Sequence, residues 1–332
     1  MPTANPPPQN ILIIGAGELG TAILEALSQH PGRHSSPISV LLRASTITSP
    51  DPAKQAQNAR LRSLVGPGGG DLVPGDIAAD GAEDLARTFA RFDVVVACAG
   101  FAGLPAGTQR RVAAAVVRAG QIREEGEGKG ERKRRIRFFP WQWGVDYDVV
   151  GEGSAQDLFD EQAAVRRLLR GQGSVDWTIV STGLFMSFLF LEGFGIVDLK
   201  ARVVRALGTW DTRVTVTTPR DIGRVVAEMV YGRGRREGIP DGVVYIAGDT
   251  VSYGAVADLV ERRFGAGFRR ELWDLDTLRQ KLKENPDDGM VKYQNVFAEG
   301  RGVAWDKEDT LNAKWGIEMQ DVKAYLDAMT ES

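Results

Sequence analysis

The residues best suited to chemistry form a glycine-rich run near the N-terminus, Gly15-Ala16-Gly17-Glu18-Leu19-Gly20. Its Gly-x-Gly-x-x-Gly spacing is typical of loops that hold the pyrophosphate of a dinucleotide. Gly15 permits a tight turn, Gly17 lets the backbone approach the phosphates, and Gly20 lets a helix pack closely on a strand. The N-terminus of that helix attracts the anion. The alternative is a turn without a ligand, but the position between a predicted strand and a predicted helix favours the dinucleotide.

The end of the second predicted strand indicates which dinucleotide is bound. An acidic residue here binds the ribose hydroxyls of NAD, whereas an arginine accommodates the 2′-phosphate of NADP. The strand ends Leu41-Leu42-Arg43, and the first acid, Asp51, lies between two prolines in the next element. Because a guanidinium pairs well with phosphate, Arg43 predicts NADPH as the cofactor. The alternative is that Arg43 is an ordinary solvated charge.

Two further strand ends supply candidate contacts for the cofactor. Asp76 follows the third predicted strand, and Ala99 and Gly100 follow the fourth. Ligands of open α/β sheets collect at the carboxyl ends of the strands. For Asp76, a contact with adenine and a role in a turn or helix cap are equally favoured, because aspartate is common at N-caps.

The other reactive residues exclude several kinds of chemistry. The sequence has two histidines, His30 and His34, and one cysteine, Cys98. A Ser-His-Asp triad and a zinc site need histidines or cysteines in other arrangements, so no metal is expected. The Tyr-x-x-x-Lys pair of typical short-chain dehydrogenases is also missing. The residues four places after the six tyrosines are Gly151, Arg235, Asp249, Ala257, Phe297 and Met329.

These residues need a scaffold, and the hydrophobic pattern predicts one of alternating strands and helices. Strands are expected at 10–14, 38–42, near Leu72, and at 94–97, 136–139 and 177–181. Helices are expected between them at 21–27, 52–64, 82–92, 108–118 and 156–170. Repeated βα units predict an α/β fold, a Rossmann doubly wound parallel sheet.

The second half of the chain predicts a smaller C-terminal substrate-binding lobe that is interwoven with the sheet. Short strands are expected at 202–206, 213–217 and 243–246, and helices at 221–231, 252–264 and 320–328. The predicted organisation is a flexible tail over 1–9, a dinucleotide-binding domain over 10–182 and the lobe over 183–332, with elements returning to the sheet.

Composition and charge limit the expected partners and compartment. Hydrophobic residues make up 43% and charged residues 26%, as in ordinary globular proteins. The net charge of −3 does not attract nucleic acid, and the basic run 132–135 is interpreted as a solvated loop. Glycines and Glu192 interrupt the apolar stretch 178–199, so no membrane span is expected. One cysteine suits a reducing compartment, which predicts a cytoplasmic protein acting on a small molecule.

Further motifs lie at and after the fifth predicted strand. They are Phe139-Pro140-Trp141-Gln142-Trp143-Gly144, Gln162-Ala163-Ala164-Val165-Arg166-Arg167, Asp176-Trp177-Thr178-Ile179-Val180 and Gly183-Leu184-Phe185. Together with the glycine loop and Leu42-Arg43, they make most of the chain similar to the NmrA-like and isoflavone reductase-like family of atypical short-chain dehydrogenases. The resemblance implies that the turn from Pro140 to Gly144 lies beside the nicotinamide.

One position departs from the family pattern. The resemblance implies a lysine that touches the nicotinamide ribose and moves a proton, and this chain has Gln162 there. A neutral amide can hold a ribose hydroxyl but cannot donate a proton as an ammonium group does. Tyr147 is a candidate donor, because a phenol can act as an acid. The nearby acids are more often solvated surface groups; they are Asp146, Asp148, Asp157, Asp160 and Glu161.

Aromatic side chains are concentrated in the same segments. The candidates for substrate binding are Trp141, Trp143, Tyr147, Phe185 and Phe188. A flat, apolar substrate would suit such a surface, because small-molecule pockets are mostly apolar. Ordinary core packing explains the aromatics equally well.

Three functions follow from these features. The first is an NADPH-dependent reductase of a small aromatic or conjugated carbonyl compound in secondary metabolism. The second is an NADP(H)-sensing regulator without turnover, which signals through a protein partner, and the third is a non-redox, isomerase-like enzyme. The missing tyrosine and lysine favour the sensor. The aromatic surface favours an enzyme, because a sensor needs no large apolar cleft, and we expect the reductase.

Overall fold

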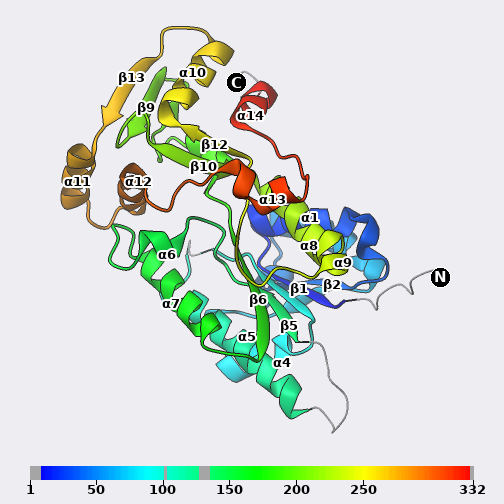
Figure 1. Cartoon of the computed structure of the whole chain (residues 1–332). Coiled ribbons are helices and arrows are strands. Elements are labelled where there is room, and N and C mark those ends of the chain that lie inside the picture. Colours follow the sequence, from blue (N-terminus) through cyan, green and yellow to red (C-terminus); the bar gives the residue numbers. More distant parts are fainter. Residues whose placement is uncertain (1–8, 101–102, 127–134, 330–332) are drawn as a thin grey trace. The chain divides into compact units, whose positions relative to one another are not determined.

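The computed structural model describes residues 9–100, 103–126 and 135–329. Its largest sheet has seven strands in the order β11-β6-β5-β4-β1-β2-β3, and Figure 1 labels β6, β5, β1 and β2 among them. In that order they span Gly242–Tyr245, Val175–Ser181, Ile136–Phe139, Val94–Ala97, Ile11–Ile14, Ile38–Leu42 and Leu72–Pro74. The pairings from β6 to β3 are all parallel. Because β2 and β4 flank β1, the sheet is doubly wound, as the sequence predicts.

The helices of this part of the chain cover the sheet. They are α1 (Glu18–Gln29), α2 (Ala44–Ile47), α3 (Pro52–Val65), α4 (Ala82–Phe89), α5 (Thr108–Glu125), α7 (Leu158–Arg170), α8 (Pro219–Val230) and α9 (Arg233–Glu237). Side chains of α4, α5 and α7 share one buried cluster with the strands, with Phe89, Val116 and Val165 among its members. Helix α8 packs on α1, since a Cβ at Gly223 would lie 2.6 Å from the carbonyl oxygen of Ala22.

Contacts divide the chain into two compact units. Unit 1 consists of 1–141, 164–179 and 223–243, and unit 2 consists of 142–163, 180–222 and 244–332. Each unit is therefore built from three separate stretches, so the second lobe is interwoven with the sheet-forming part. The single boundary after residue 182 stays a prediction.

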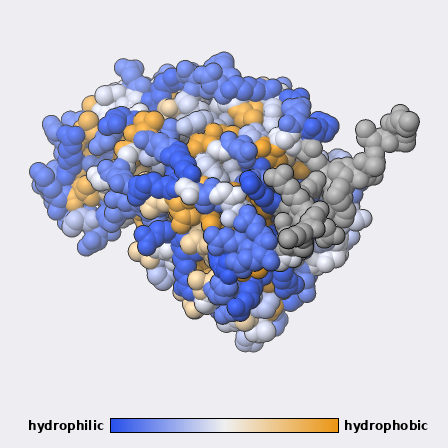
Figure 2. Space-filling view, turned by 60° about the horizontal axis from the view of Figure 1, so that its bottom comes forward, coloured by the Kyte–Doolittle hydropathy of each residue, from blue (hydrophilic) through white to orange (hydrophobic). Residues whose placement is uncertain are grey.

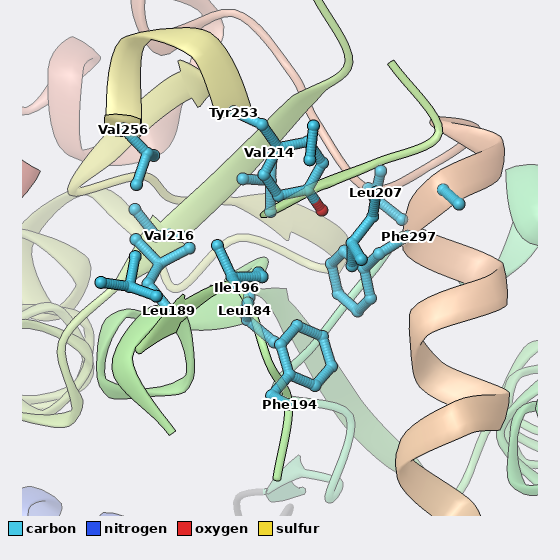
Figure 3. Packing of buried hydrophobic residues seen from close by; sticks show 14 of the residues in the cluster. Leu184, Leu189, Phe194, Ile196, Leu207, Val214, Val216, Tyr253, Val256 and Phe297 are labelled. Atoms are coloured by element: carbon cyan, nitrogen blue, oxygen red, sulfur yellow. The ribbon is translucent and has the colours of Figure 1, made fainter. Parts of the chain in front are cut away.

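Unit 2 contains two small sheets, ordered β12-β10-β7 and β13-β9-β8. Their strands are β7 (Leu184–Phe185), β8 (Val197–Asp198), β9 (Val203–Leu207), β10 (Arg213–Thr217), β12 (Asp249–Ser252) and β13 (Arg269–Trp273). The helices are α6 (Tyr147–Val150), α10 (Tyr253–Phe264), α11 (Leu275–Glu284), α12 (Gly289–Glu299), α13 (Leu311–Lys314) and α14 (Val322–Ala328). Figure 3 shows strand residues such as Val214 and Val216 meeting Tyr253 and Phe297 from the helices in one apolar core.

Local sequence explains the elements that surround the first strand. All four residues of β1 are buried, which matches a continuous apolar run in a parallel strand. Helix α1 buries Leu19, Ile23 and Leu27, which are four residues apart and share one face. Asp51 caps α3 by accepting hydrogen bonds from the backbone N–H groups of Ala53 and Lys54.

Several elements differ from the prediction. Helix α1 begins at Glu18 and not at Thr21, because the last part of the glycine loop is already helical. The strand expected at 243–246 joins the large sheet as a seventh strand, whereas β13, α11 and α12 were not predicted. Residues 1–8 of the predicted tail and 132–134 of the basic run lie outside the described residues.

The sequence predicts no membrane span, and the apolar stretch 178–199 was the candidate to consider. In the described part of the chain, no helix is both long and apolar enough to cross a bilayer. The stretch 178–199 instead contains the end of β6, the short strand β7 and a 3-10 helix, η3 (Met186–Phe190). On the face seen in Figure 2, hydrophilic residues predominate and hydrophobic residues form patches among them.

We expect Gly223→Ala to lower stability, because the added methyl group forces α8 away from the backbone of α1. Overpacking of this kind costs about 1–3 kcal/mol, which exceeds the helix-propensity gain of about 1 kcal/mol at most. The matched control is Gly289→Ala, where a Cβ meets nothing within 4 Å. Thermal unfolding compares the two variants. Equal melting temperatures would contradict the close contact.

Candidate functional site

The glycine loop joins β1 to α1 in a geometry that requires its first and last glycines. Gly15 has φ +90°, and a Cβ there would lie 3.0 Å from that of Ala99. At Gly20 a Cβ would lie 2.1 Å from the carbonyl oxygen of Gly15. By contrast, nothing lies within 4 Å of a Cβ built on Gly17. The space beside Gly17 is therefore open, as a loop that receives a ligand requires.

The first turn of α1 offers backbone donors at this open space. Gly17 is the N-cap residue, and no side chain caps the helix. The first N–H groups of a helix have no partner within it, and the helix dipole is positive at this end. Glu18 is exposed, whereas Leu19 and Gly20 are buried. This arrangement suits a phosphate anion.

A cavity of about 430 Å³ lies next to the loop in unit 1. The first three residues of the glycine loop, Gly15 to Gly17, and the carboxyl ends of β2, β3 and β4 line it. Parallel sheets bind ligands at this edge, where the strand order reverses. Cys98 directly follows β4 and lines the cavity. Burial raises the pKa of its thiol, which keeps the thiol protonated.

Arg43 lies on the rim of this cavity, directly after β2. Its side chain is exposed, and no carboxylate of the described residues forms an ion pair with it. The nearest acid in sequence, Asp51, is engaged in capping α3. The β2 end therefore presents a cation without a competing acid.

Asp76, Ala99 and Gly100 also line the cavity. Asp76 Oδ1 accepts a hydrogen bond from the Ala78 N–H at 2.9 Å, so the turn role expected of it is present. A contact between Asp76 and adenine stays a prediction. A Cβ on Gly100 would lie 3.4 Å from the indole of Trp141, so Trp141 stands beside this end of β4.

The predicted ribose contact, Gln162, lies in unit 2 together with Trp143. Both are buried, at 2% and 5% exposure. The Gln162 backbone oxygen accepts a hydrogen bond from Gln142 Nε2 at 2.8 Å. Its side-chain oxygen Oε1 is buried without a hydrogen-bond partner among the described residues. A buried acceptor of this kind is costly unless a ligand supplies a donor.

Tyr147 occupies the first position of α6 and faces the core of unit 2. Its ring is 4% exposed and packs edge-on against Phe159, with centroids 4.9 Å apart. A Cβ on Gly144 would lie 2.6 Å from the Tyr147 hydroxyl, so that oxygen lies against the backbone of the aromatic turn. The position resembles that of a core tyrosine. Its role as a proton donor stays a prediction.

The nearby carboxylates are engaged in structural contacts. Asp146 caps α6 and accepts a hydrogen bond from the Tyr245 hydroxyl at 2.7 Å. Asp160 accepts one from the Gly153 N–H. Asp157 is bound by Lys292 Nζ at 2.9 Å, and this hydrogen bond lowers the pKa of the Asp157 carboxyl. Glu161 and Asp148 have partners too.

The two phenylalanines predicted to bind substrate lie in β7 and η3. Phe188 packs against the core of unit 2 and meets Phe194 edge-on at 5.9 Å. Phe185 is half-buried and meets Phe188 at 6.3 Å. Core packing thus accounts for one side of Phe188, and substrate contact stays a prediction for both.

Sequence reasoning missed two polar residues that line the cavity, Thr46 and Gln57. Thr46 lies in the short helix α2, and Gln57 reaches the cavity from α3. The predicted helix at 52–64 includes Gln57, but a polar residue on an amphipathic helix gives no sign of the loop it faces.

A model of the NmrA-like family matches residues 7–326. The chain belongs to the NmrA-like family. An NmrA-like family domain-containing oxidoreductase of Gibberella moniliformis (strain M3125 / FGSC 7600) is 50% identical over 318 residues, which are 96% of this chain and 97% of that protein. The family resemblance inferred from the motifs is thereby confirmed.

Solved structures with the NmrA-like fold of this chain include reductases. An isoflavone reductase superposes with a TM-score of 0.73 at 20% identity, covering 97% of this chain and 99% of that one. A leucoanthocyanidin reductase of Vitis vinifera in a binary complex with NADPH gives 0.71 at 17% identity, covering 96% and 98%. At these identities the likeness establishes the fold.

We expect Asp157→Asn to leave the fall of any pH–rate profile toward high pH unchanged. The lowered pKa of Asp157 means that its carboxyl is ionised at neutral pH and has no proton to give. The ion pair stabilises the fold above the ordinary aspartate pKa, and this contribution disappears as the pH falls through the lowered value.

Because 71% of the Asp157 side chain is exposed, the loss at pH 7 should be below about 1 kcal/mol. Denaturant unfolding at pH 7 and in acid measures it, and Lys292→Met should give a matching loss at pH 7. A profile that loses its fall toward high pH in Asp157→Asn would identify this carboxyl as the donor.

Proposed function

We propose that this protein is an NADPH-dependent reductase of a small aromatic or conjugated carbonyl compound, with a role in secondary metabolism. The observation that carries the proposal is the cavity at the carboxyl edge of the sheet, where an uncapped helix N-terminus and an exposed Arg43 face the same space. A pyrophosphate and a 2′-phosphate are the anions that suit these two groups. The NADPH complex of the related fold supports the choice.

The residues present fit a dinucleotide in three ways. The space beside Gly17 is open to the close approach of phosphate oxygens. Arg43 can bind the 2′-phosphate that distinguishes NADPH from NADH, because no acid at the end of β2 competes for its guanidinium. Asp76 is assigned to the adenosine side, and Ala99 and Gly100 to the passage toward the nicotinamide.

Gln162 is assigned to the ribose next to the nicotinamide, following the family resemblance. Its buried, unpaired Oε1 is an acceptor that a ribose hydroxyl would satisfy. The cofactor supplies hydride to the substrate. The proton must then come from solvent or from a side chain such as Tyr147, because Gln162 has none to give and the neighbouring carboxylates are engaged.

This shortage of acids favours conjugated substrates. Hydride addition to an enone or a quinone leaves a negative charge that is spread over several atoms, and such an anion takes a proton from water without a strong enzyme acid. An isolated ketone yields an alkoxide, which depends much more on a positioned donor. Trp141, Trp143, Tyr147, Phe185 and Phe188 are assigned to the flat substrate on the same reasoning.

A second candidate is an NADP(H)-sensing regulator that binds the dinucleotide without turnover and acts through a protein partner. The observation in its favour is Gln162 itself, which replaces the proton-moving lysine. Fluorescence titration with NADPH and NADH, followed by absorbance assays with quinones, enones and aromatic aldehydes, separates the two. Oxidation of NADPH in the presence of one of these substrate classes supports the reductase. Tight binding without oxidation by any of them supports the sensor.

We expect Arg43→Ala to weaken NADPH binding by about tenfold or more, the effect of losing one charge-assisted pair. NADH binding should stay within about twofold, because NADH lacks the 2′-phosphate that the guanidinium holds. Fluorescence titration measures both constants. Arg62→Ala, an exposed arginine on α3 away from the cavity, is the control. A wild-type preference for NADH would contradict the assignment.

We expect Gln162→Lys to raise the rate of NADPH oxidation with an isolated carbonyl substrate such as an aromatic aldehyde. A buried ammonium group has a lowered pKa and can donate a proton near neutral pH. A restored acid commonly contributes about 100-fold or more. Gln162→Met keeps the volume without the proton and should give no gain. Equal rates for Lys and Met would show that the proton does not limit turnover.

A further inference from the structure

Helix α3 carries two adjacent amides that hold different walls of the cavity. Gln57 Nε2 donates a hydrogen bond to the carbonyl oxygen of Ala16 at 3.1 Å. Asn58 Nδ2 donates to the carbonyl oxygens of Thr46 at 2.9 Å and Ile47 at 3.3 Å. Successive residues of a helix point about 100° apart. The two amides therefore reach separate segments, the glycine loop and the turn after β2.

Asn58 completes the turn that carries Arg43. Helix α2 has four residues, and Arg43 precedes it as the N-cap, its carbonyl oxygen accepting from the N–H groups of Thr46 and Ile47. So short a helix is unstable alone. Within the turn, the Thr46 carbonyl oxygen accepts a hydrogen bond from the Ser49 N–H at 3.4 Å. Asn58, 2% exposed, adds a donor from α3 to the carbonyl oxygens of Thr46 and Ile47. Both Arg43 and Thr46 line the cavity, so Asn58 fixes the wall on which they stand.

The buried position of Asn58 is energetically unfavourable for one of its side-chain atoms. Its Oδ1 is buried without a hydrogen-bond partner in the described part of the chain. A buried acceptor without a donor is unfavourable. The two bonds made by Nδ2 are thus what this side chain contributes, and an apolar residue of similar size would avoid the cost.

Gln57 acts on the loop that faces the pyrophosphate. The Ala16 carbonyl oxygen that it holds also accepts a bond from Thr21 Oγ1 at 3.3 Å. In a planar trans peptide the carbonyl oxygen and the following N–H point in opposite directions. Fixing the Ala16 oxygen toward α3 therefore directs the Gly17 N–H away from α3.

We propose that Gln57 and Asn58 are positioning residues of the dinucleotide site with separate duties. Asn58 sets the turn that carries Arg43, and so selects for the 2′-phosphate. Gln57 sets the loop for the pyrophosphate, which NADPH and NADH share. The inference rests on the proposed function, in which this cavity receives NADPH.

The test compares the dissociation constants of NADPH and NADH in the full-length chain by fluorescence titration. In Asn58→Ala we expect NADPH to bind about tenfold more weakly and NADH to stay within about twofold, so the selectivity ratio falls. In Gln57→Ala both cofactors should weaken by the same factor, leaving the ratio unchanged. Gln55→Ala, an exposed amide on the same helix, should change neither constant.

The selectivity ratio distinguishes positioning from simple loss of structure, which would weaken both cofactors together. Asn58→Ser is the second variant if Asn58→Ala does not fold, because its hydroxyl is too short to hold both carbonyl groups and should also lower the ratio. If the folded Asn58 variants keep the wild-type ratio of NADPH to NADH affinity, the inference is overturned but the proposed function is not. Binding of neither cofactor by the wild-type chain overturns the proposed function, and the inference with it.

Discussion

The approach of Gly20 to the carbonyl oxygen of Gly15 is the constraint on which the site depends. A Cβ at Gly20 would lie 2.1 Å from that oxygen, so only hydrogen fits between the end of β1 and the first turn of α1. The close contact places the open N-terminus of α1 at the carboxyl edge of the sheet. A bulkier residue would move the helix back and remove the backbone donors from the cavity. The glycine spacing thus sets the distance between the end of β1 and the first turn of α1. That distance places the backbone donors where an anion can bind.

The other walls are positioned by contacts from behind the cavity. The β2 end depends on Asn58, and the β4 end depends on α5, where Gln109 Nε2 donates to the Ala99 carbonyl oxygen at 2.9 Å. Each loop is therefore held by a side-chain amide of a helix that packs behind it. Such prior ordering lowers the entropy that a ligand would otherwise have to lose on binding. Side-chain amides thus hold three segments of the cavity wall, the glycine loop and the ends of β2 and β4.

The spacing of hydrophobic residues along the sequence was enough to predict most of unit 1. Strands β2, β4 and β5 lie where the sequence places them, because short apolar runs between turn residues have few alternatives. The pattern does not identify a strand's neighbours, so the place of β11 at the edge of the large sheet was missed. The hydrophobic pattern also did not predict β13 and α11. Most residues of that stretch are half-buried or exposed, so hydrophobic residues do not recur there at a clear spacing. The glycine loop and Arg43 were found because their chemistry is local, whereas Gln57 and Asn58 act on segments 41 and 12 residues away.

Gln162, which stands where the family resemblance implies a lysine, separates two properties that the resemblance combines in one residue. Its amide oxygen, buried and unpaired, keeps the capacity to hold a hydroxyl. Its amide cannot release a proton, and the acids in the neighbouring segments are already bound, Asp146 by Tyr245 and Asp157 by Lys292. In the proposed reductase, a site of this composition binds NADPH but depends on the substrate to stabilise the charge that follows hydride transfer. Delocalised acceptors meet that requirement by their own chemistry, so under the proposed function the missing acid restricts the substrate and does not by itself abolish the reaction.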